Sequence, residues 1–257
     1  MMSYRQHWIA LYEKDRSDLR SILLKDPFYL WEGNRAPENR AERDLVYALE
    51  IACAEPGSPD CRSYLQRALA VVNRALREEK FKAGRCAEGF PRNRGDLLRV
   101  KAYTGFFLGG LLDQAALRQA SFDYEERCKQ FGPADWDSQL QAYCLTAIRV
   151  ALLGGDMDHA RRMLHTEKSF NWHAEEHVIL KLLVENMVGT TLAESYRTAL
   201  LPVFDAYFDR IRDPFFKPVV FLQVQMLRIE FAFLRDKYLI SADGQIDRTR
   251  VLGSIAA

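Results

Sequence analysis

Residues 140–164, LQAYCLTAIRVALLGGDMDHARRML, predict a helix, a turn and a second helix. Gly154 and Gly155 end the first helix, because glycine readily takes the backbone conformation of a helix C-terminus. Asp156 caps the next one, since its short side chain accepts hydrogen bonds from free N–H groups. Before the turn, apolar side chains recur with the three- and four-residue spacing of one helix face. They are Leu140, Tyr143, Cys144, Ala147, Ile148 and Ala151.

A similar run of residues occurs 45 positions earlier, counted from residue 153 back to residue 108. Leu108-Gly109-Gly110 precedes Asp113 and Ala115, as Leu153-Gly154-Gly155 precedes Asp158 and Ala160. Two-helix repeat proteins have periods in this range. The spacing therefore fits either a short α-solenoid of the TPR or HEAT kind or two unrelated hairpins with similar turns.

Helical periodicity extends over the rest of the chain. Helices are expected over about residues 8–23, 37–54, 60–80, 173–188 and 192–211, with a loop over 84–95. After Pro218, Val220, Leu222, Val224 and Met226 alternate like a strand, but the length of the apolar segment favours a helix packed on both sides. We expect an all-α fold of nine or ten helices in antiparallel hairpins. One domain would span residues 1–240, followed by a loosely held tail over 241–257.

Composition places the chain among ordinary globular proteins. It has 257 residues, 36 basic and 35 acidic side chains, a net charge of +1 and 48% hydrophobic residues. Near-neutrality gives no reason to expect nucleic acid or membrane as a partner. Charged residues interrupt the N-terminus, so no signal peptide is expected. Five cysteines without a Cys-x-x-Cys pair fit a reducing cytoplasm.

One motif carries recognisable chemistry. His173-Ala174-Glu175-Glu176-His177 matches H-x-x-E-H, in which two histidines on one helix face bind zinc and a glutamate acts as general base. A further carboxylate ligand would have to come from a downstream glutamate. These are Glu185, Glu194 and Glu230. The other interpretation is a helix capped by Asn171, with Glu175 and Glu176 favourably placed in its first turn.

Other signals of catalysis are weak, and we expect no enzyme activity, metal or cofactor. The chain lacks a Gly-x-Ser-x-Gly nucleophile elbow. The carboxylates of Asp123, Glu125 and Glu126 could be read as a magnesium site. Pairing with Arg127 and Lys129 on an exposed helix is the more ordinary explanation.

Charge is distributed unevenly along the chain. Residues 60–101 contain 11 basic and 5 acidic side chains, whereas residues 103–209 contain 9 basic and 15 acidic ones. This asymmetry is either a solvated surface or an acidic face that meets a basic partner. The candidate partner-binding residues are Asp113, Asp123, Glu125, Glu126, Asp135, Asp137, Asp156, Asp158, Glu175 and Glu176.

The segment 143–183, with its phrases LLGGDMDHARRML and WHAEEHVILKLL, resembles bacterial immunity proteins of polymorphic-toxin and type VI secretion systems. The all-helical immunity family forty-nine is the nearest resemblance. It implies a non-catalytic antitoxin that binds and occludes a cognate protein toxin in the cytoplasm. Two alternatives stay open: a helical-repeat scaffold or adaptor for protein–protein interaction, and a zinc-dependent hydrolase that uses residues 173–177.

Overall fold

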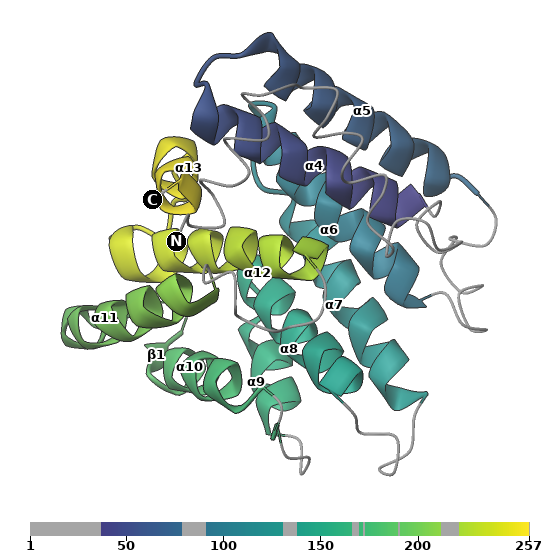
Figure 1. The fold of residues 1–257 in the computed structure, drawn as a ribbon. Helices are drawn as coiled ribbons and strands as arrows, with labels where there is room; N and C mark the ends of the chain where they lie inside the picture. Colours follow the sequence, from purple (N-terminus) through teal and green to yellow (C-terminus); the bar gives the residue numbers. More distant parts are fainter. Residues whose placement is uncertain are drawn as a thin grey trace.

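The computed structural model describes residues 37–78, 91–130, 138–165, 170–171, 173–189, 191–211 and 221–256, and these contain ten α-helices (Figure 1). The all-α prediction is confirmed. The helix expected over residues 8–23 lies outside the described residues, as do Asp135 and Asp137.

Six helices lie in a row, each packed on the next (Figure 1). They are α4 (Pro37–Ala54), α5 (Pro59–Ala75), α6 (Pro91–Phe107), α7 (Gln114–Lys129), α8 (Ser138–Leu153) and α9 (Met157–Leu164). Short turns join α4 to α5, α6 to α7 and α8 to α9, so each of these pairs is an antiparallel hairpin, as predicted.

The second half of the chain folds back onto this row. It comprises α10 (Ala174–Glu185), β1 (Met187–Val188), β2 (Thr191–Leu192), α11 (Glu194–Ile211), α12 (Phe221–Leu234), the π-helix η4 (Arg235–Ile240) and α13 (Arg248–Ala256). The two short strands pair antiparallel around Gly189, whose φ of 65° glycine adopts easily. The sequence did not predict this hairpin.

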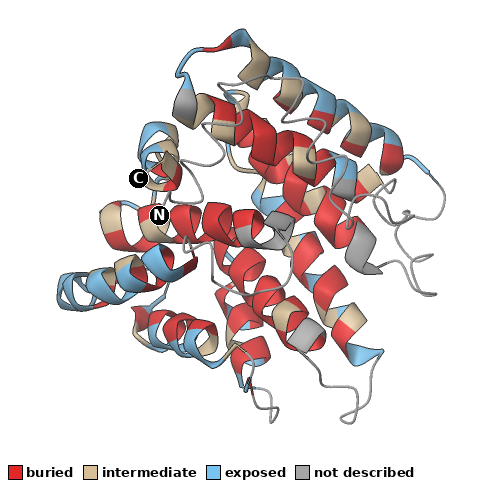
Figure 2. Ribbon diagram, viewed as in Figure 1, coloured by how far each residue is buried: buried red, intermediate tan, exposed pale blue. Residues whose placement is uncertain are grey.

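Helix α12 lies at the centre of the molecule and packs on α4, α8, α11 and α13 (Figure 1). Every residue from 225 to 234 is buried, which confirms a helix covered on both sides. In Figure 2 buried residues line the inner faces of the surrounding helices, and exposed residues line the outer faces of α5, α10 and α11. No helix within the described ranges has the length and apolarity needed to cross a membrane.

Prolines and glycines set several helix boundaries. Helix α4 begins at Pro37 and ends at Ala54, as predicted, because a first-turn residue needs no N–H donor. The loop expected up to residue 95 is wrong from Pro91 onward, where α6 begins. Gly95 lies inside α6 because α7 comes close to it. A Cβ atom there would meet the Tyr124 ring at 3.2 Å.

The turns after α6 and α8 close in the same way. Gly109 and Gly155 have φ values of 114° and 75°, and Asp113 and Asp156 accept hydrogen bonds from backbone N–H groups at 2.9 and 3.0 Å. The predicted cap at Asp156 is confirmed. Residues 110–112 lie between Gly109 and Asp113 in the first turn, whereas Gly155 and Asp156 are adjacent in the second. The turns therefore share a glycine helix end and an aspartate cap but differ in length, so they do not follow an exact 45-residue period.

The prediction of a loosely held C-terminal tail is wrong for residues 241–256. Val251 is 0% exposed and Ile255 is 3% exposed. Arg228 on α12 donates to the Ile255 carbonyl at 2.7 Å, and Arg248 donates to the Phe106 carbonyl at 2.8 Å. Apolar burial and these hydrogen bonds fix α13 against α12 and against the end of α6.

The π-helix holds the C-terminal end of α8. Lys237 Nζ donates to the carbonyls of Leu152 and Leu153 at 2.9 and 3.1 Å, and Tyr238 OH donates to Leu152 at 2.6 Å. The last carbonyls of a helix lack partners within the helix and favour a nearby cation. The C-terminal segment therefore binds the C-terminal ends of α6 and α8, the first helices of the two hairpins that the sequence predicted.

Candidate functional site

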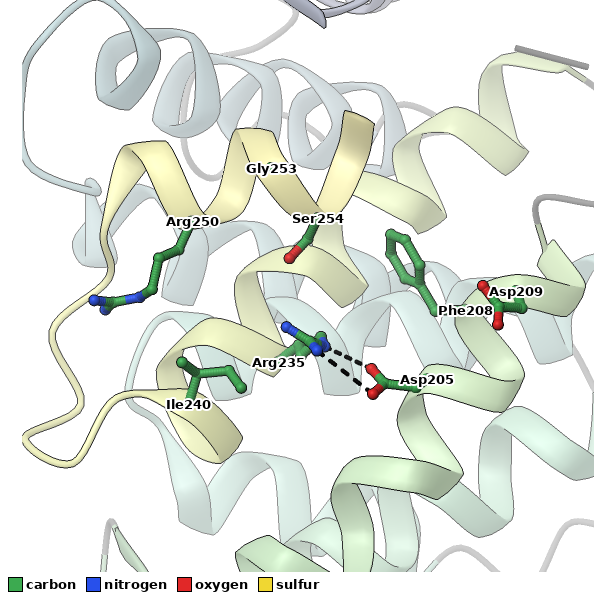
Figure 3. A pocket seen from close by; sticks show the side chains of 8 residues that line it. All are labelled: Asp205, Phe208, Asp209, Arg235, Ile240, Arg250, Gly253 and Ser254. Carbon is green, nitrogen blue, oxygen red and sulfur yellow. Dashed lines mark hydrogen bonds and ion pairs between the residues drawn. The ribbon is translucent and has the colours of Figure 1, made fainter. Parts of the chain in front are cut away.

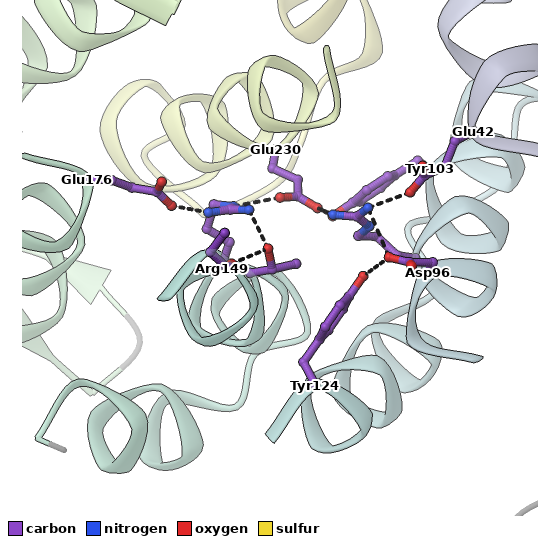
Figure 4. A network of polar contacts seen from close by, with 10 residues as sticks. Glu42, Asp96, Tyr103, Tyr124, Arg149, Glu176 and Glu230 are labelled. Atoms are coloured by element: carbon purple, nitrogen blue, oxygen red, sulfur yellow. Dashed lines mark hydrogen bonds and ion pairs between the residues drawn. The ribbon is translucent and has the colours of Figure 1, made fainter. Parts of the chain in front are cut away.

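A network of polar side chains fills the space between α12 and the helices around it (Figure 4). We call it the interior charge network. It comprises Glu42, Asp96, Arg99, Tyr103, Tyr124, Thr146, Arg149, Glu176 and Glu230. All nine residues are buried. Two of them were singled out from the sequence: Glu230 as a possible zinc ligand, and Glu176 as a general base or a partner contact.

Glu230 on α12 is the centre of the network and is 0% exposed. Its Oε1 accepts hydrogen bonds from Arg99 Nη1 at 3.1 Å and from Tyr103 OH at 3.0 Å. Its Oε2 accepts from Arg149 Nε at 2.6 Å. Both oxygens of this carboxylate are therefore satisfied, as a buried charge requires.

Arg99 extends the network toward α4 and α7. Its Nη2 donates to Glu42 Oε1 at 2.6 Å and to Asp96 Oδ1 at 3.3 Å. The hydroxyl of Tyr124 donates to the same oxygen of Asp96. This end of the network joins α4, α6 and α7.

Arg149 extends the network toward α10. Its Nη1 pairs with Glu176, and its Nη2 donates to Thr146 Oγ1 at 2.7 Å. Burial, followed by the charge of Glu176, raises the pKa of Tyr207 on α11. Glu176, expected at the surface as a partner contact or general base, instead lies in the interior. Its carboxylate pairs with the buried, charged side chain of Arg149.

The pKa shifts indicate a structural role for this network. Burial by itself disfavours the charged form of Arg99, but Tyr124, Glu230 and the other carboxylates outweigh burial and raise its pKa well above the usual value. Burial, and then Glu230, raises the pKa of Tyr103 well above 10. These groups keep one protonation state around neutral pH, so they are poorly suited to exchange protons with a substrate.

Asp123 belongs to a second buried ion pair. Arg94 Nε on α6 donates to Asp123 Oδ2 at 2.7 Å, and Asp123 is 3% exposed. Burial raises the pKa of Asp123, and Arg94 offsets part of that rise. The expectation of an exposed residue is therefore wrong, because this side of α7 faces α6.

Ser121, Glu125 and His159 lie in the order of a hydrolytic triad. Ser121 Oγ is 3.3 Å from His159 Nδ1, and His159 Nε2 is 3.1 Å from Glu125 Oε2. Ser121 and His159 are both 0% exposed, however, and the serine hydroxyl donates to the Ala147 carbonyl at 2.8 Å. A serine buried in this way cannot attack a substrate, so the arrangement holds α7, α8 and α9 together.

The H-x-x-E-H motif begins α10, and its glutamate, Glu176, is paired with Arg149. The N-cap residue of α10 is His173, whose side chain makes no capping hydrogen bond, and not Asn171 as in the other interpretation of this segment. The His177 ring stacks on Phe170 at 4.3 Å, and burial lowers its pKa. Within the described residues, no three His, Cys, Asp or Glu side chains gather as metal ligands.

Several predicted partner-binding carboxylates are at the surface, each beside a cation. Lys101 lies 3.6 Å from Asp113, and Arg210 lies 2.6 Å from Glu175. Lys129 lies 3.1 Å from Glu125 and 3.0 Å from Glu126, so the expected pairing on α7 is confirmed for Lys129, whereas Asp123 pairs with Arg94. Arg161 lies 3.5 Å from Asp158.

The structure brings four of these carboxylates to the neighbouring surfaces of α7 and α9. We call this surface the α7–α9 face, and it comprises Phe122, Glu125, Glu126, Asp156 and Asp158, with the buried His159 ring beneath Phe122. The Phe122 ring covers the buried His159 ring at 4.3 Å. Burial lowers the pKa of His159, while Glu125 and Asp156 oppose this change. Asp158 and Glu126 project furthest, with 85% and 61% of their side chains exposed.

A pocket of about 480 Å³ lies between α11, η4 and α13 (Figure 3). Its lining residues are Asp205, Phe208, Asp209, Arg235, Ile240, Arg250, Gly253 and Ser254. Nothing in the sequence predicted this pocket. The only local signal was the i, i+4 pair of aspartates on α11, a spacing too common to indicate a site.

Comparison of the chain with protein-family models, curated proteins and solved structures finds no match.

Proposed function

We propose that this chain is a non-catalytic immunity protein that binds and occludes a cognate bacterial toxin. One contrast carries the proposal: the interior charge network and the Ser121–His159 pair are buried and bonded within the protein, whereas carboxylates remain exposed on the α7–α9 face. An occluding protein needs a stable, charged surface and no reaction centre.

The α7–α9 face suits a basic partner such as a nuclease toxin. Asp158 and Glu126 extend into solvent, and their own cations are surface arginine or lysine side chains. Exposed ion pairs are worth little, about 0–1 kcal/mol, so a partner's arginines can replace them at small cost. Carboxylates placed in the phosphate groove of a nuclease would block its substrate.

The four cysteines within the described residues form no disulfide, which suits action in a reducing cytoplasm. Toxins delivered between bacteria would be met there. No nucleic acid, membrane or cofactor is part of this proposal.

Co-expression tests the proposal directly. The tagged chain is purified from its native cell, the co-purifying protein is identified by mass spectrometry, and that protein is expressed alone in a second bacterium. We expect it to arrest growth alone and to be harmless when this chain is co-expressed. A partner that is harmless alone, or toxic despite co-expression, would contradict the proposal.

A helical-repeat adaptor is the second candidate, favoured by the matching turns after α6 and α8. Repeated hairpins make extended binding surfaces. The same purification distinguishes the two candidates, because an adaptor would bring down several partners and none would be toxic.

A further inference from the structure

Exposed apolar side chains gather on α10, β1 and α11. Within the described part of the chain seven large apolar side chains are exposed, and five of them lie between residues 178 and 203. These five are 36–77% exposed: Val178, Leu182, Val188, Tyr196 and Val203. Single exposed apolar residues are ordinary, but a contiguous group of them marks an interface. We call these five residues, together with the exposed Ala199 and Ala206, the α10–α11 surface.

On α11 the exposed residues form one stripe. Its members recur at alternating spacings of three and four residues, and they are Tyr196, Ala199, Val203, Ala206 and Arg210. This is the a and d spacing of helices that pack side by side along their length. The other side of α11 is buried in the protein, at Leu200, Phe204, Tyr207, Phe208 and Ile211. Helix α11 therefore has two packing sides, and the outer one faces solvent.

A second row of exposed residues lies beside this stripe, on α10. Glu175 in the first turn of α10 lies 2.6 Å from Arg210 in the last turn of α11, so the two helices run antiparallel. Val178 and Leu182 follow Glu175 at spacings of three and four, on the same side of α10. The two rows therefore extend together from this ion pair toward the strand that carries Val188. Figure 2 shows exposed residues along the outer faces of both helices.

The charges around the α10–α11 surface balance within one copy of the chain. The flanking ion pairs are Glu175–Arg210, Lys181–Glu185 and Glu194–Arg197, at 2.6, 3.7 and 2.7 Å. The surface therefore offers no excess charge to attract a basic toxin or an anionic ligand. A second copy of the same surface meets no excess of like charge either, and the net charge of the whole chain is only +1.

We propose that the α10–α11 surface pairs two copies of this chain about a two-fold axis that passes close to Val203. Two-fold dimers are the commonest oligomers, and they need a surface that is complementary to itself. When two α11 stripes run antiparallel about this axis, Ala199 of one copy meets Ala206 of the other. These small side chains let the two helices approach closely.

The ends of the stripe also match in this register. Tyr196 of one copy meets Arg210 of the other, and an aromatic ring attracts a guanidinium. Arg210 can keep its ion pair with Glu175, because its edge binds a carboxylate while its face stacks on a ring. Helices α10 and α11 of both copies together make a bundle of four helices. The inference is independent of toxin binding, because the α7–α9 face lies on different helices.

Sedimentation velocity of the full chain across micromolar concentrations tests the proposal. We expect a species with twice the mass of one chain. Val203→Lys should weaken self-association about a hundredfold or more, because two lysines then face each other across the axis. The matched control is Leu111→Lys, which changes another exposed apolar residue and should dimerise as the parent does. A monomeric parent would overturn the proposal, and so would a Val203→Lys variant that dimerises as well as the parent.

Charge complementation tests the position of the axis. Val203→Glu alone should also be monomeric, whereas an equimolar mixture of Val203→Lys and Val203→Glu should form a mixed dimer, because opposite charges then meet. A mixture that stays monomeric would refute the axis at Val203. Circular dichroism checks that each variant keeps the helix content of the parent. If the fold does not tolerate a charge at this position, Ala206→Trp blocks the close approach of the helices and should give a monomer, and a dimer would refute the interface.

Discussion

Arg149 and Glu230 are 81 positions apart in the chain, yet Arg149 Nε lies 2.6 Å from Glu230 Oε2 in the centre of the protein. This pair connects the helix row to α12, and the rest of the interior charge network extends from it. Removing a buried carboxylate that two arginines bind strongly destabilises the fold, because the two arginines remain charged and buried.

Glu230→Ala should therefore lower the free energy of unfolding by about 3–5 kcal/mol. Chemical denaturation followed by circular dichroism measures the change. The control is Glu126→Ala at an exposed position, where the expected change is within about 0.5 kcal/mol. Equal effects of the two variants would contradict a structural role for the network.

Stability should fall in mild acid through His159. Burial lowers the pKa of His159 below its usual 6.5, so the unfolded chain binds the proton more tightly. The free energy of unfolding therefore decreases as the pH falls below about 6.5 and through the folded-state pKa. His159→Gln should reduce the loss between pH 7 and pH 5 without removing it, since burial also lowers the pKa of His177. A variant that loses as much stability as the parent would disprove this assignment.

Lys237 gives a second pH dependence at alkaline pH. Burial, assisted by Arg118, lowers the pKa of Lys237 to about 8 from 10.5. Between these values the unfolded chain binds more protons, so this group makes the free energy of unfolding rise with pH. Lys237→Met should remove that rise, measured as the difference between the two proteins from pH 8 to pH 10. The lysine Cε resonance should titrate near pH 8 in the parent, and titration near 10.5 would argue against the shift.

Val251→Asp tests whether α13 is part of the core. Val251 is 0% exposed, and an unpaired carboxylate there should lower the free energy of unfolding by about 3 kcal/mol or more. Thr249→Asp, at an exposed position two residues away, is the control and should be nearly neutral. A loosely held C-terminus would tolerate both changes equally.

Charge reversal on the α7–α9 face tests how the toxin is recognised. Asp158→Lys should slow association with the partner by about tenfold at low salt. Added salt should also slow the association of the unaltered protein. Glu194→Lys is a matched control. Both residues lie in the first turn of a helix beside an arginine three positions later, with 85% and 78% of the side chain exposed. If both reversals act alike, the toxin does not dock on this face.

Local sequence features predicted the elements of the fold well. Proline at residue 37 and glycine at residues 154 and 155 mark helix boundaries that the structure confirms. The break between the helices expected over residues 173–188 and 192–211 is a two-stranded hairpin, which the sequence did not predict. Whether the residues between α10 and α11 pair as strands depends on how the two helices are oriented, which helical periodicity does not specify.

Charged residues were predicted less well. Asp123 and Glu176 were assigned to the surface because carboxylates beside other charges usually lie there. In the structure each meets a buried arginine, Arg94 or Arg149, from another helix. Their roles depend on which side of the helix its neighbours cover.

The sequence by itself determined the helices, their turns and the capping aspartates, because these depend on side chains within about four positions of each other. Only the tertiary structure decided the interior charge network, the docking of α13 and the pocket beside η4. Their partners lie far apart along the chain, as Arg99 and Glu230 do at a separation of 131 positions. A carboxylate has the same local pattern whether it faces water or an arginine brought to it by packing, so burial and pairing follow only from the arrangement of the helices.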